Sequence, residues 1–171
     1  MKKSELLAEE YPQYFFTYIS KAADLDLIEG LQSSCNQTLS LFKNIPDHKF
    51  EFAYDEGKWT IKEIIQHLID AERVFAYRAL RFARGDKNNL PGYDENEYVP
   101  TSLANRRSTE SLIKEYTVLR QTTIDLFNSF TQDMLLQIGI ADYCKISVRA
   151  LGFVIIGHET HHCEVIKERY L

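Results

Sequence analysis

The sequence predicts an all-α fold, a four-helix bundle with a long crossover between its second and third helices. Four segments of roughly 20 residues repeat apolar side chains at helical spacing. No stretch of comparable length alternates between apolar and polar residues as a strand would, and a long connection joins the second segment to the third. The 171 residues, 44% of them hydrophobic, are enough for a single domain, residues 1–171, with a packed core.

The first two helices have recognisable N-terminal caps. We expect the first to begin near Asp24, whose carboxylate can accept a hydrogen bond from a backbone N–H. Its buried face would hold Leu25, Ile28, Leu31, Leu39 and Phe42. The second helix begins at Thr60, because Thr60 and Glu63 form the capping-box pattern, and Gly85 is a natural end.

The third and fourth helices each begin at a serine. We expect the third to run from about Ser108 to Phe130, and the fourth from about Ser147 to the C-terminus. Roughly twenty residues between Gly85 and about Arg107 join the second helix to the third. A tight antiparallel turn needs far fewer, so this connection can cross the bundle and let both helices run in the same direction. The fourth helix would then run opposite to the second.

The fourth helix carries a pair of histidines suited to binding a metal ion. His158 and His162 stand four residues apart, which places both imidazoles on one helix face, about 6 Å apart. Two ring nitrogens at that spacing can bind one divalent ion. His67, on the second helix, could supply a third nitrogen. The sequence therefore predicts a metal site formed by His67, His158 and His162.

The depth of these histidines in their helices supports a shared site. His67 lies seven residues after Thr60, about 10 Å along the helix. His162 lies seven residues before Arg169, also about 10 Å from the end of its helix. These depths coincide when the two helices are antiparallel, whereas parallel helices would separate His67 and His162 by roughly 12 Å. The three-histidine site therefore requires the crossover.

Each histidine also has a simpler explanation. A single histidine on an apolar helix face is most often a hydrogen-bonded core residue. His161 could replace His158 or His162 as a ligand. His158 and His162 are preferred, because Ile155 and Ile166 indicate that their face of the helix points toward the core. His48, in a polar loop, is expected to be solvated.

The residues from His158 to His162 also match HExxH, the signature of a class of zinc proteases in which Glu159 would be the catalytic base. Those proteases take their third ligand from downstream of the motif. Only nine residues follow His162, and they contain no further histidine and no glycine turn. A protease of this kind is therefore disfavoured, but Glu159 is still a candidate catalytic residue that would act on a metal-bound water.

Charge and cysteine content narrow the other possibilities. The net charge of −5 disfavours binding to duplex nucleic acid, which requires a basic surface. Cys35, Cys144 and Cys163 form no CxxC pair, so we expect reduced thiols in a cytoplasmic protein. Cys163 follows His162 but is turned by ~100° around the helix, so it is expected to pack rather than bind metal. No stretch of 18 apolar residues is present, so neither a membrane span nor secretion is expected.

Several segments together resemble the DinB-like metalloprotein superfamily, which is named after DNA-damage-inducible bundle proteins. The resemblance lies in the stretch from Gly57-Lys58-Trp59-Thr60 through His67 to Arg73, in Leu90-Pro91-Gly92-Tyr93-Asp94, and in the closing Gly-His-Glu-x-His-His. It covers nearly the whole chain and implies a DinB/YfiT-like four-helix bundle, usually a homodimer. It also implies zinc or nickel held by one histidine of the second helix and two of the fourth. By motif these are His67, His158 and His162.

The resemblance implies two kinds of chemistry at this site. Some members transfer a low-molecular-weight thiol to an electrophile or use a thiol in isomerisation, and others are regarded as metal-dependent hydrolases. Three nitrogen donors and an open position can activate either a thiol or a water molecule. The alternative is a non-enzymatic dimeric bundle in which the metal is structural or absent.

Three further residues could support a reaction on a small-molecule substrate. Arg78 lies on the same helix stripe as His67 and could bind an anionic group of the substrate or cosubstrate. Tyr93, in the crossover, could line the mouth of the pocket. Asp70, one turn after His67, could orient an imidazole N–H. Each of the three could equally be an ordinary surface or loop residue.

Overall fold

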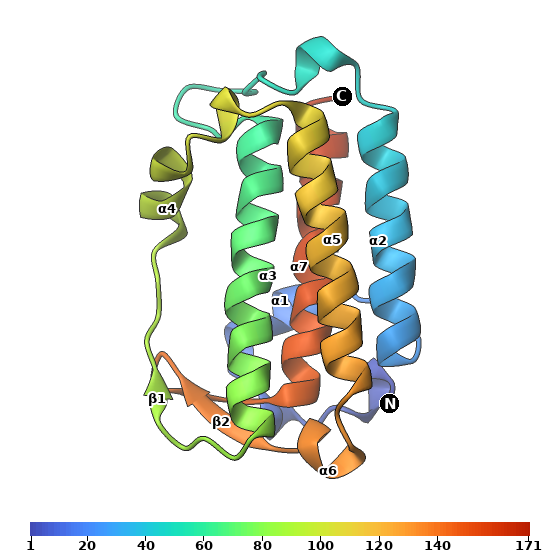
Figure 1. Ribbon diagram of the computed structural model, residues 1–171, viewed down its shortest axis with the longest axis vertical. Coiled ribbons are helices and arrows are strands. Elements are labelled where there is room, and N and C mark those ends of the chain that lie inside the picture. The colour runs from blue at the N-terminus through green and yellow to red at the C-terminus, as the bar shows by residue number, and fades with distance from the viewer.

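The computed structural model describes residues 1–171 and contains the four long helices that the sequence predicts (Figure 1). They are α2, Leu27–Lys43; α3, Ile61–Ala83; α5, Thr109–Asn128; and α7, Val148–Arg169. α3 has the predicted capping box, because the Thr60 hydroxyl accepts from the Glu63 N–H and the Glu63 carboxylate accepts from the Thr60 N–H. Ser108 and Ser147 cap α5 and α7, as expected.

The cap of the first long helix differs from the prediction. Asp26, and not Asp24, caps α2 by accepting from the Ile28 N–H. Asp24 instead accepts hydrogen bonds from the Ser4 backbone N–H and hydroxyl. Both aspartates precede the same apolar run, so the local sequence does not distinguish them.

The predicted crossover topology is confirmed. α3 and α5 run in the same direction, and α2 and α7 run the opposite way (Figure 1). α3 packs against both α5 and α7, and α2 packs against the same two helices. α3 and α7 are therefore antiparallel neighbours, which is the arrangement that the depths of the histidines require.

The crossover contains short ordered elements. Gly85 follows the end of α3 with a φ of 83°, a left-handed conformation that glycine adopts without strain. The chain then forms β1, Asn89–Leu90, and α4, Glu95–Ser102, which packs against α3. The Asp94 side chain caps α4 by accepting a backbone N–H of its first turn. This cap fixes the first turn of α4, and with it Glu95, alongside α3.

A small three-stranded sheet, which the sequence did not predict, closes one end of the bundle (Figure 1). After α6, Gln132–Leu135, the strand β2, Ile138–Ala141, pairs in parallel with β1 and antiparallel with β3, Cys144–Ser147. Asp142 and Tyr143 form the turn between β2 and β3, both with positive φ, as a type I′ hairpin turn requires. Strands of two to four residues are too short for their alternation to be recognised in a sequence.

The N-terminal segment, for which the sequence predicts no element, folds against α7. It contains three 3₁₀ turns and the short helix α1, Phe16–Ile19, which packs on α7. The buried Glu10 carboxylate accepts hydrogen bonds from Arg149 at the start of α7. Gly157 permits the close approach of α1, because a Cβ at this position would lie 1.8 Å from the Tyr18 carbonyl oxygen. Tyr18 is thereby held beside the histidines of α7.

α7 is the central helix of the fold. Every residue from Val148 to Glu159 is buried, because α1, α2 and α3 all pack against this helix. Burial on all sides is typical of a helix inside a bundle, and over this stretch α7 has no face that points toward solvent. His158 and Glu159 are therefore both buried, although they face different neighbours.

The cysteines are all free thiols, as expected. Cys163 packs in the core with its Sγ 3.3 Å from the Thr38 hydroxyl oxygen, and it takes no part in the histidine cluster. Burial raises the pKa of the Cys163 thiol to about 11, so the thiol stays protonated at neutral pH. None of the helices combines the length and hydrophobicity that a membrane span requires.

Candidate metal centre

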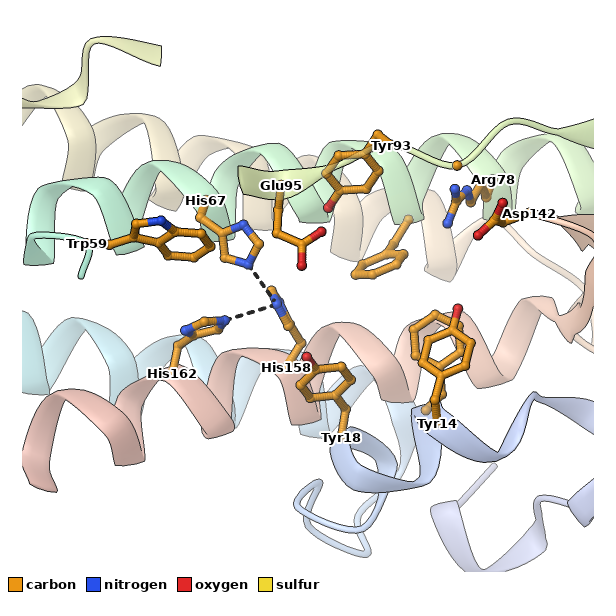
Figure 2. A pocket seen from close by; sticks show the side chains of 13 residues that line it. Tyr14, Tyr18, Trp59, His67, Arg78, Tyr93, Glu95, Asp142, His158 and His162 are labelled. Carbon is orange, nitrogen blue, oxygen red and sulfur yellow. Dashed lines mark hydrogen bonds between the residues drawn. The ribbon is translucent and has the colours of Figure 1, made fainter. Parts of the chain in front are cut away.

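Three histidine rings from two helices converge inside the bundle (Figure 2). His67 comes from α3, and His158 and His162 come from successive turns of α7. The Nε2 atom of His158 lies 3.0 Å from Nε2 of His67 and 3.2 Å from Nε2 of His162. One nitrogen from each ring lies within 4.8 Å of the other two. The structure thus brings together the three residues that were selected from helix spacing.

The geometry and chemistry of this group fit a divalent metal ion. Two nitrogens that bind one tetrahedral ion at about 2.0–2.1 Å lie about 3.3 Å apart. The distances from His158 to His67 and to His162, 3.0 and 3.2 Å, are close to this value, and the nitrogens of His67 and His162 lie within 4.8 Å of each other. Burial lowers the pKa of His67 to about 4, and burial together with the neighbouring imidazoles holds the pKa values of His158 and His162 well below their usual range. The three rings are therefore neutral at pH 7, the form that binds metal. Zinc and nickel both accept such ligands.

Aromatic side chains surround the three imidazoles. The ring centroid of Trp59 lies 4.9 Å from that of His67, and Trp59 stacks on His162 at 6.4 Å. Tyr18 meets His158 edge-on at 5.0 Å. Trp59 immediately precedes the cap of α3 and Tyr18 belongs to α1, so two segments outside the histidine-bearing helices restrict the orientation of the rings.

The histidines stand at one end of an elongated cavity of about 370 Å³ (Figure 2). Arg78 and Asp142 lie toward the other end. The crossover contributes Tyr93 and Glu95 to the wall, and the side chain of Glu95 extends beside His67. The cavity therefore combines three neutral nitrogen donors, two carboxylates and one guanidinium in a partly aromatic enclosure.

Glu159 does not line this cavity. Its carboxylate, 2% exposed, accepts hydrogen bonds from Arg120 at 3.0 Å and from the Tyr116 hydroxyl. Arg120 in turn forms a bidentate ion pair with Glu72, with both contacts at 2.9 Å. Burial and the charge of Glu159 raise the pKa of Tyr116 well above its usual range, so its hydroxyl remains a donor. The carboxylate of the HExxH pattern is thus engaged in a buried ion-pair cluster and does not face the converging nitrogens.

The other residues selected from the sequence are divided between the cavity and its surroundings. Arg78 and Tyr93 both line the cavity. Asp70 lies outside it and pairs with Arg73, one turn along α3. His161 is not part of the converging group and instead lines a neighbouring cavity.

Several cavity residues were not anticipated from the sequence. Tyr14 and Tyr18 come from the N-terminal segment, where a run of aromatic residues was the available signal. Glu95 follows a recognisable cap, Asp94, but its direction depends on how α4 packs against α3. Asp142 is brought to the cavity by the hairpin of the unpredicted sheet, and its local sequence contains no signal for that position.

Comparison with known proteins places this fold and site in a family. The model of the DinB superfamily matches residues 31–166. A protein of Oceanobacillus iheyensis, named as a proposed metal-dependent hydrolase, is 22% identical over 142 residues, which is 82% of this chain and 81% of that protein. The solved structure of YfiT from Bacillus subtilis, described as a probable metal-dependent hydrolase with an unusual four-helix bundle topology, has a TM-score of 0.67 at 16% identity, over 96% of this chain and 88% of YfiT. These matches confirm the predicted fold, and the chain belongs to the DinB superfamily.

Proposed function

We propose that the protein is a metal-dependent hydrolase that acts on a small molecule in the cavity beside the three histidines. The observation that carries this proposal is the number of protein ligands: His67, His158 and His162 converge without a fourth His, Cys, Asp or Glu. Structural zinc sites are normally closed by four protein ligands, whereas catalytic sites keep one position for water or substrate. Metal-dependent hydrolysis is also what the descriptions of the Oceanobacillus relative and of YfiT suggest.

The side chains around the site have distinct roles in such a reaction. A divalent ion, when bound, lowers the pKa of a water molecule and polarises the substrate carbonyl. Glu95, the cavity carboxylate beside His67, accepts the proton that the attacking water loses and returns it to the leaving group as the scissile bond breaks. Burial raises the pKa of Tyr93 to about 12, so its hydroxyl is a protonated donor for the substrate. Glu95 thus takes the role that the HExxH pattern suggested for Glu159.

A second cavity supports a second candidate, a thiol S-transferase. This cavity of about 320 Å³ shares Trp59 and His162 with the first, and Lys58 and His161 are also in its wall. A reaction that joins two substrates needs two binding spaces that meet at the reacting centre. A low-molecular-weight thiol could occupy the second cavity while its electrophile occupies the first, whereas hydrolysis needs only one of them.

Metal content is the first test of the proposal. Mass spectrometry of the untagged protein, reconstituted with zinc and with nickel, should find about one equivalent of metal per chain. The His67→Ala variant should lose the metal, because only two ligands on one helix remain. The matched control is His48→Ala, since His48 is exposed and distant from the cluster. A reconstituted parent protein without metal would overturn the proposal and favour a non-enzymatic bundle.

Turnover separates the two candidate activities. The metal-loaded protein should hydrolyse members of a panel of small esters and amides in the absence of thiol. Turnover that requires both a low-molecular-weight thiol and an electrophile would favour the transferase. A protein that binds metal and converts neither panel would contradict both, and would leave the metal with a structural role.

We also propose that the protein is a homodimer, as the family resemblance implies. All the residues assigned to the site belong to one chain, so a second copy is not needed to complete it. Light scattering of the metal-loaded protein would measure the mass, and a monomer at all concentrations would contradict this expectation.

A further inference from the structure

Arg78 differs from the other buried basic side chains of the protein. The buried lysines and arginines are Lys62, Arg78, Arg120 and Arg149. All of them except Arg78 form ion pairs with glutamates. A buried charge without a counter-ion is costly, because burial removes its hydration without replacing it. Arg78, which is 6% exposed, therefore has no direct ion-pair partner; the carboxylate of Asp142, whose charge acts on Arg78, lines the same cavity but forms no salt bridge with it.

The guanidinium of Arg78 projects into the cavity of the histidine cluster (Figure 2). One of its N–H groups donates to the Pro91 carbonyl oxygen at 2.9 Å. The other N–H groups of Arg78 have no hydrogen-bond partner in the protein. Their nitrogens are nevertheless not fully buried, because the one buried side-chain nitrogen or oxygen without a partner is Thr123 Oγ1. These N–H groups therefore face accessible space, and that space is the cavity.

The surroundings of Arg78 provide further donors. Burial lowers the pKa of Arg78. The pKa of Arg149, which has a direct carboxylate partner, is instead raised by its hydrogen bond to Glu10. The guanidinium of Arg78 nevertheless stays protonated at neutral pH, since the ordinary pKa of arginine lies far above neutrality. Burial also raises the pKa of Tyr14 to about 12, so the hydroxyl of this neighbour is a protonated donor too.

Arg78 and the histidines are placed to bind two ends of one molecule. Arg78 follows His67 by eleven residues, or about three turns, so both side chains lie on the same face of α3. Their Cα atoms are about 16 Å apart along the helix axis. Both side chains tilt toward the N-terminus of the helix, but the arginine side chain is several ångströms longer than the imidazole, so the gap between their polar ends is shorter than this separation, on the order of 10 Å.

We propose that the substrate is a small elongated carboxylate, whose carboxylate group binds Arg78 while its reacting bond lies at the histidine cluster. This inference rests on the proposed hydrolase function. A carboxylate supplies the direct ion-pair partner that Arg78 lacks and matches the planar guanidinium with two parallel hydrogen bonds. A single negative charge fits the cavity better than the double charge of a phosphate, because Glu95 and Asp142 line the same space.

Two hydroxamic acids of equal chain length provide the test. Suberic acid monohydroxamate carries a metal-binding hydroxamate at one end and a carboxylate at the other, about 10 Å away when extended. Octanohydroxamic acid has a methyl group in place of that carboxylate. Affinities for the zinc-loaded protein are measured by calorimetry and by the fluorescence of Trp59, the one tryptophan of the chain, which lines the cavity.

We expect the parent protein to bind the carboxylate compound roughly tenfold or more tightly than the methyl compound. Arg78→Met should abolish this preference, and Arg78→Lys should retain part of it. The matched control is Arg73→Met, an exposed arginine of the same helix, which should keep the full preference. Binding of octanohydroxamic acid by Arg78→Met at least as tight as by the parent shows that the variant is folded and that its metal centre is intact, because methionine leaves an apolar wall for the methyl end.

Equal affinity of the parent protein for the two compounds would overturn the carboxylate proposal and leave the metal centre unaffected. Failure of both compounds to bind the zinc-loaded protein would instead count against the metal-dependent function itself. A phosphonate of the same length that binds more tightly than the carboxylate would overturn the assignment to a singly charged group.

Discussion

Replacement of Glu159 by glutamine tests whether the glutamate of the HExxH pattern is structural. Its carboxylate is 2% exposed and accepts hydrogen bonds from Arg120 at 3.0 Å and from the Tyr116 hydroxyl. Glutamine has nearly the same shape but no charge, and one of its two terminal groups donates hydrogen bonds and cannot accept them. The substitution therefore weakens the contacts of Glu159 without leaving a cavity.

We expect Glu159→Gln to lower the free energy of unfolding by about 2 kcal/mol. A hydrogen bond to a charged group contributes about 1.5–3 kcal/mol. Arg120 keeps its bidentate pair with Glu72, so its charge does not lose every partner. Arg120→Met, which leaves both glutamates without a counter-ion, should cost more, about 3–5 kcal/mol.

Urea unfolding followed by far-ultraviolet circular dichroism measures these differences. The protein is kept metal-free with a chelator, because bound metal would stabilise the folded state by itself. The matched control is Glu164→Gln, on the same helix. Glu164 forms a partly exposed ion pair with Lys21, and pairs of this kind contribute about 0–1 kcal/mol.

An unfolding free energy of Glu159→Gln within about 0.5 kcal/mol of the parent, as is typical of surface substitutions, would refute this reasoning. A glutamate whose carboxylate is free to act as a base would give that result together with the loss of hydrolytic activity. A structural Glu159 therefore predicts that Glu159→Gln lowers the free energy of unfolding. A catalytic Glu159 predicts that the variant keeps its stability and loses hydrolytic activity.

Three further substitutions test separate features of the structure. Gly157→Ala should lower the free energy of unfolding by about 1–3 kcal/mol in the same urea assay, because its Cβ would lie 1.8 Å from the Tyr18 carbonyl oxygen. Unchanged stability would mean that α1 does not pack closely against α7 at this position. Glu95→Gln should reduce hydrolysis about a hundredfold or more at unchanged metal content by mass spectrometry, and loss of metal would instead make Glu95 a ligand. Burial raises the pKa of Glu10, but hydrogen bonds from Arg149 and its other partners outweigh burial and leave this pKa below the ordinary value of 4.5. The stabilisation by Glu10 is then complete above about pH 4.5 and lost as the pH falls through the folded-state pKa. The free energies of unfolding of the parent and of Glu10→Gln, measured by urea titration, should therefore converge in acid. A difference between the two proteins that stays constant with pH would contradict this.

The helices and their directions were predictable because they depend on neighbouring residues. Side chains such as Thr60 and Ser108 mark helix starts, since the first backbone N–H groups of a helix need acceptors outside it. The length of the connection after Gly85 indicated a crossover, and the spacing of His158 and His162 placed both on one face. All of this information is contained in short stretches of one chain.

The surroundings of the site were not predictable in the same way, because they depend on distant segments. Glu159 is turned by ~100° from His158, and its partner there is Arg120 of α5. A buried arginine of a helix cannot be distinguished from an exposed one by its own sequence. Asp142 reaches the cavity only because β2 pairs with β1, and both strands are too short to be recognised.

The crossover links the fold to the proposed chemistry. Because it lets α3 and α5 run in the same direction, α3 and α7 are antiparallel and His67 meets the histidines of α7 at the same depth. The same segment contributes Tyr93 and Glu95 to the cavity, and its Pro91 carbonyl accepts a hydrogen bond from Arg78. A tight turn in its place would make α3 and α7 parallel, separate their histidines by roughly 12 Å, and remove the carboxylate to which we assign the proton transfer. The proposed metal ligands, the proposed proton acceptor and the proposed anion site therefore all depend on this one connection, and the HExxH pattern alone could not supply them.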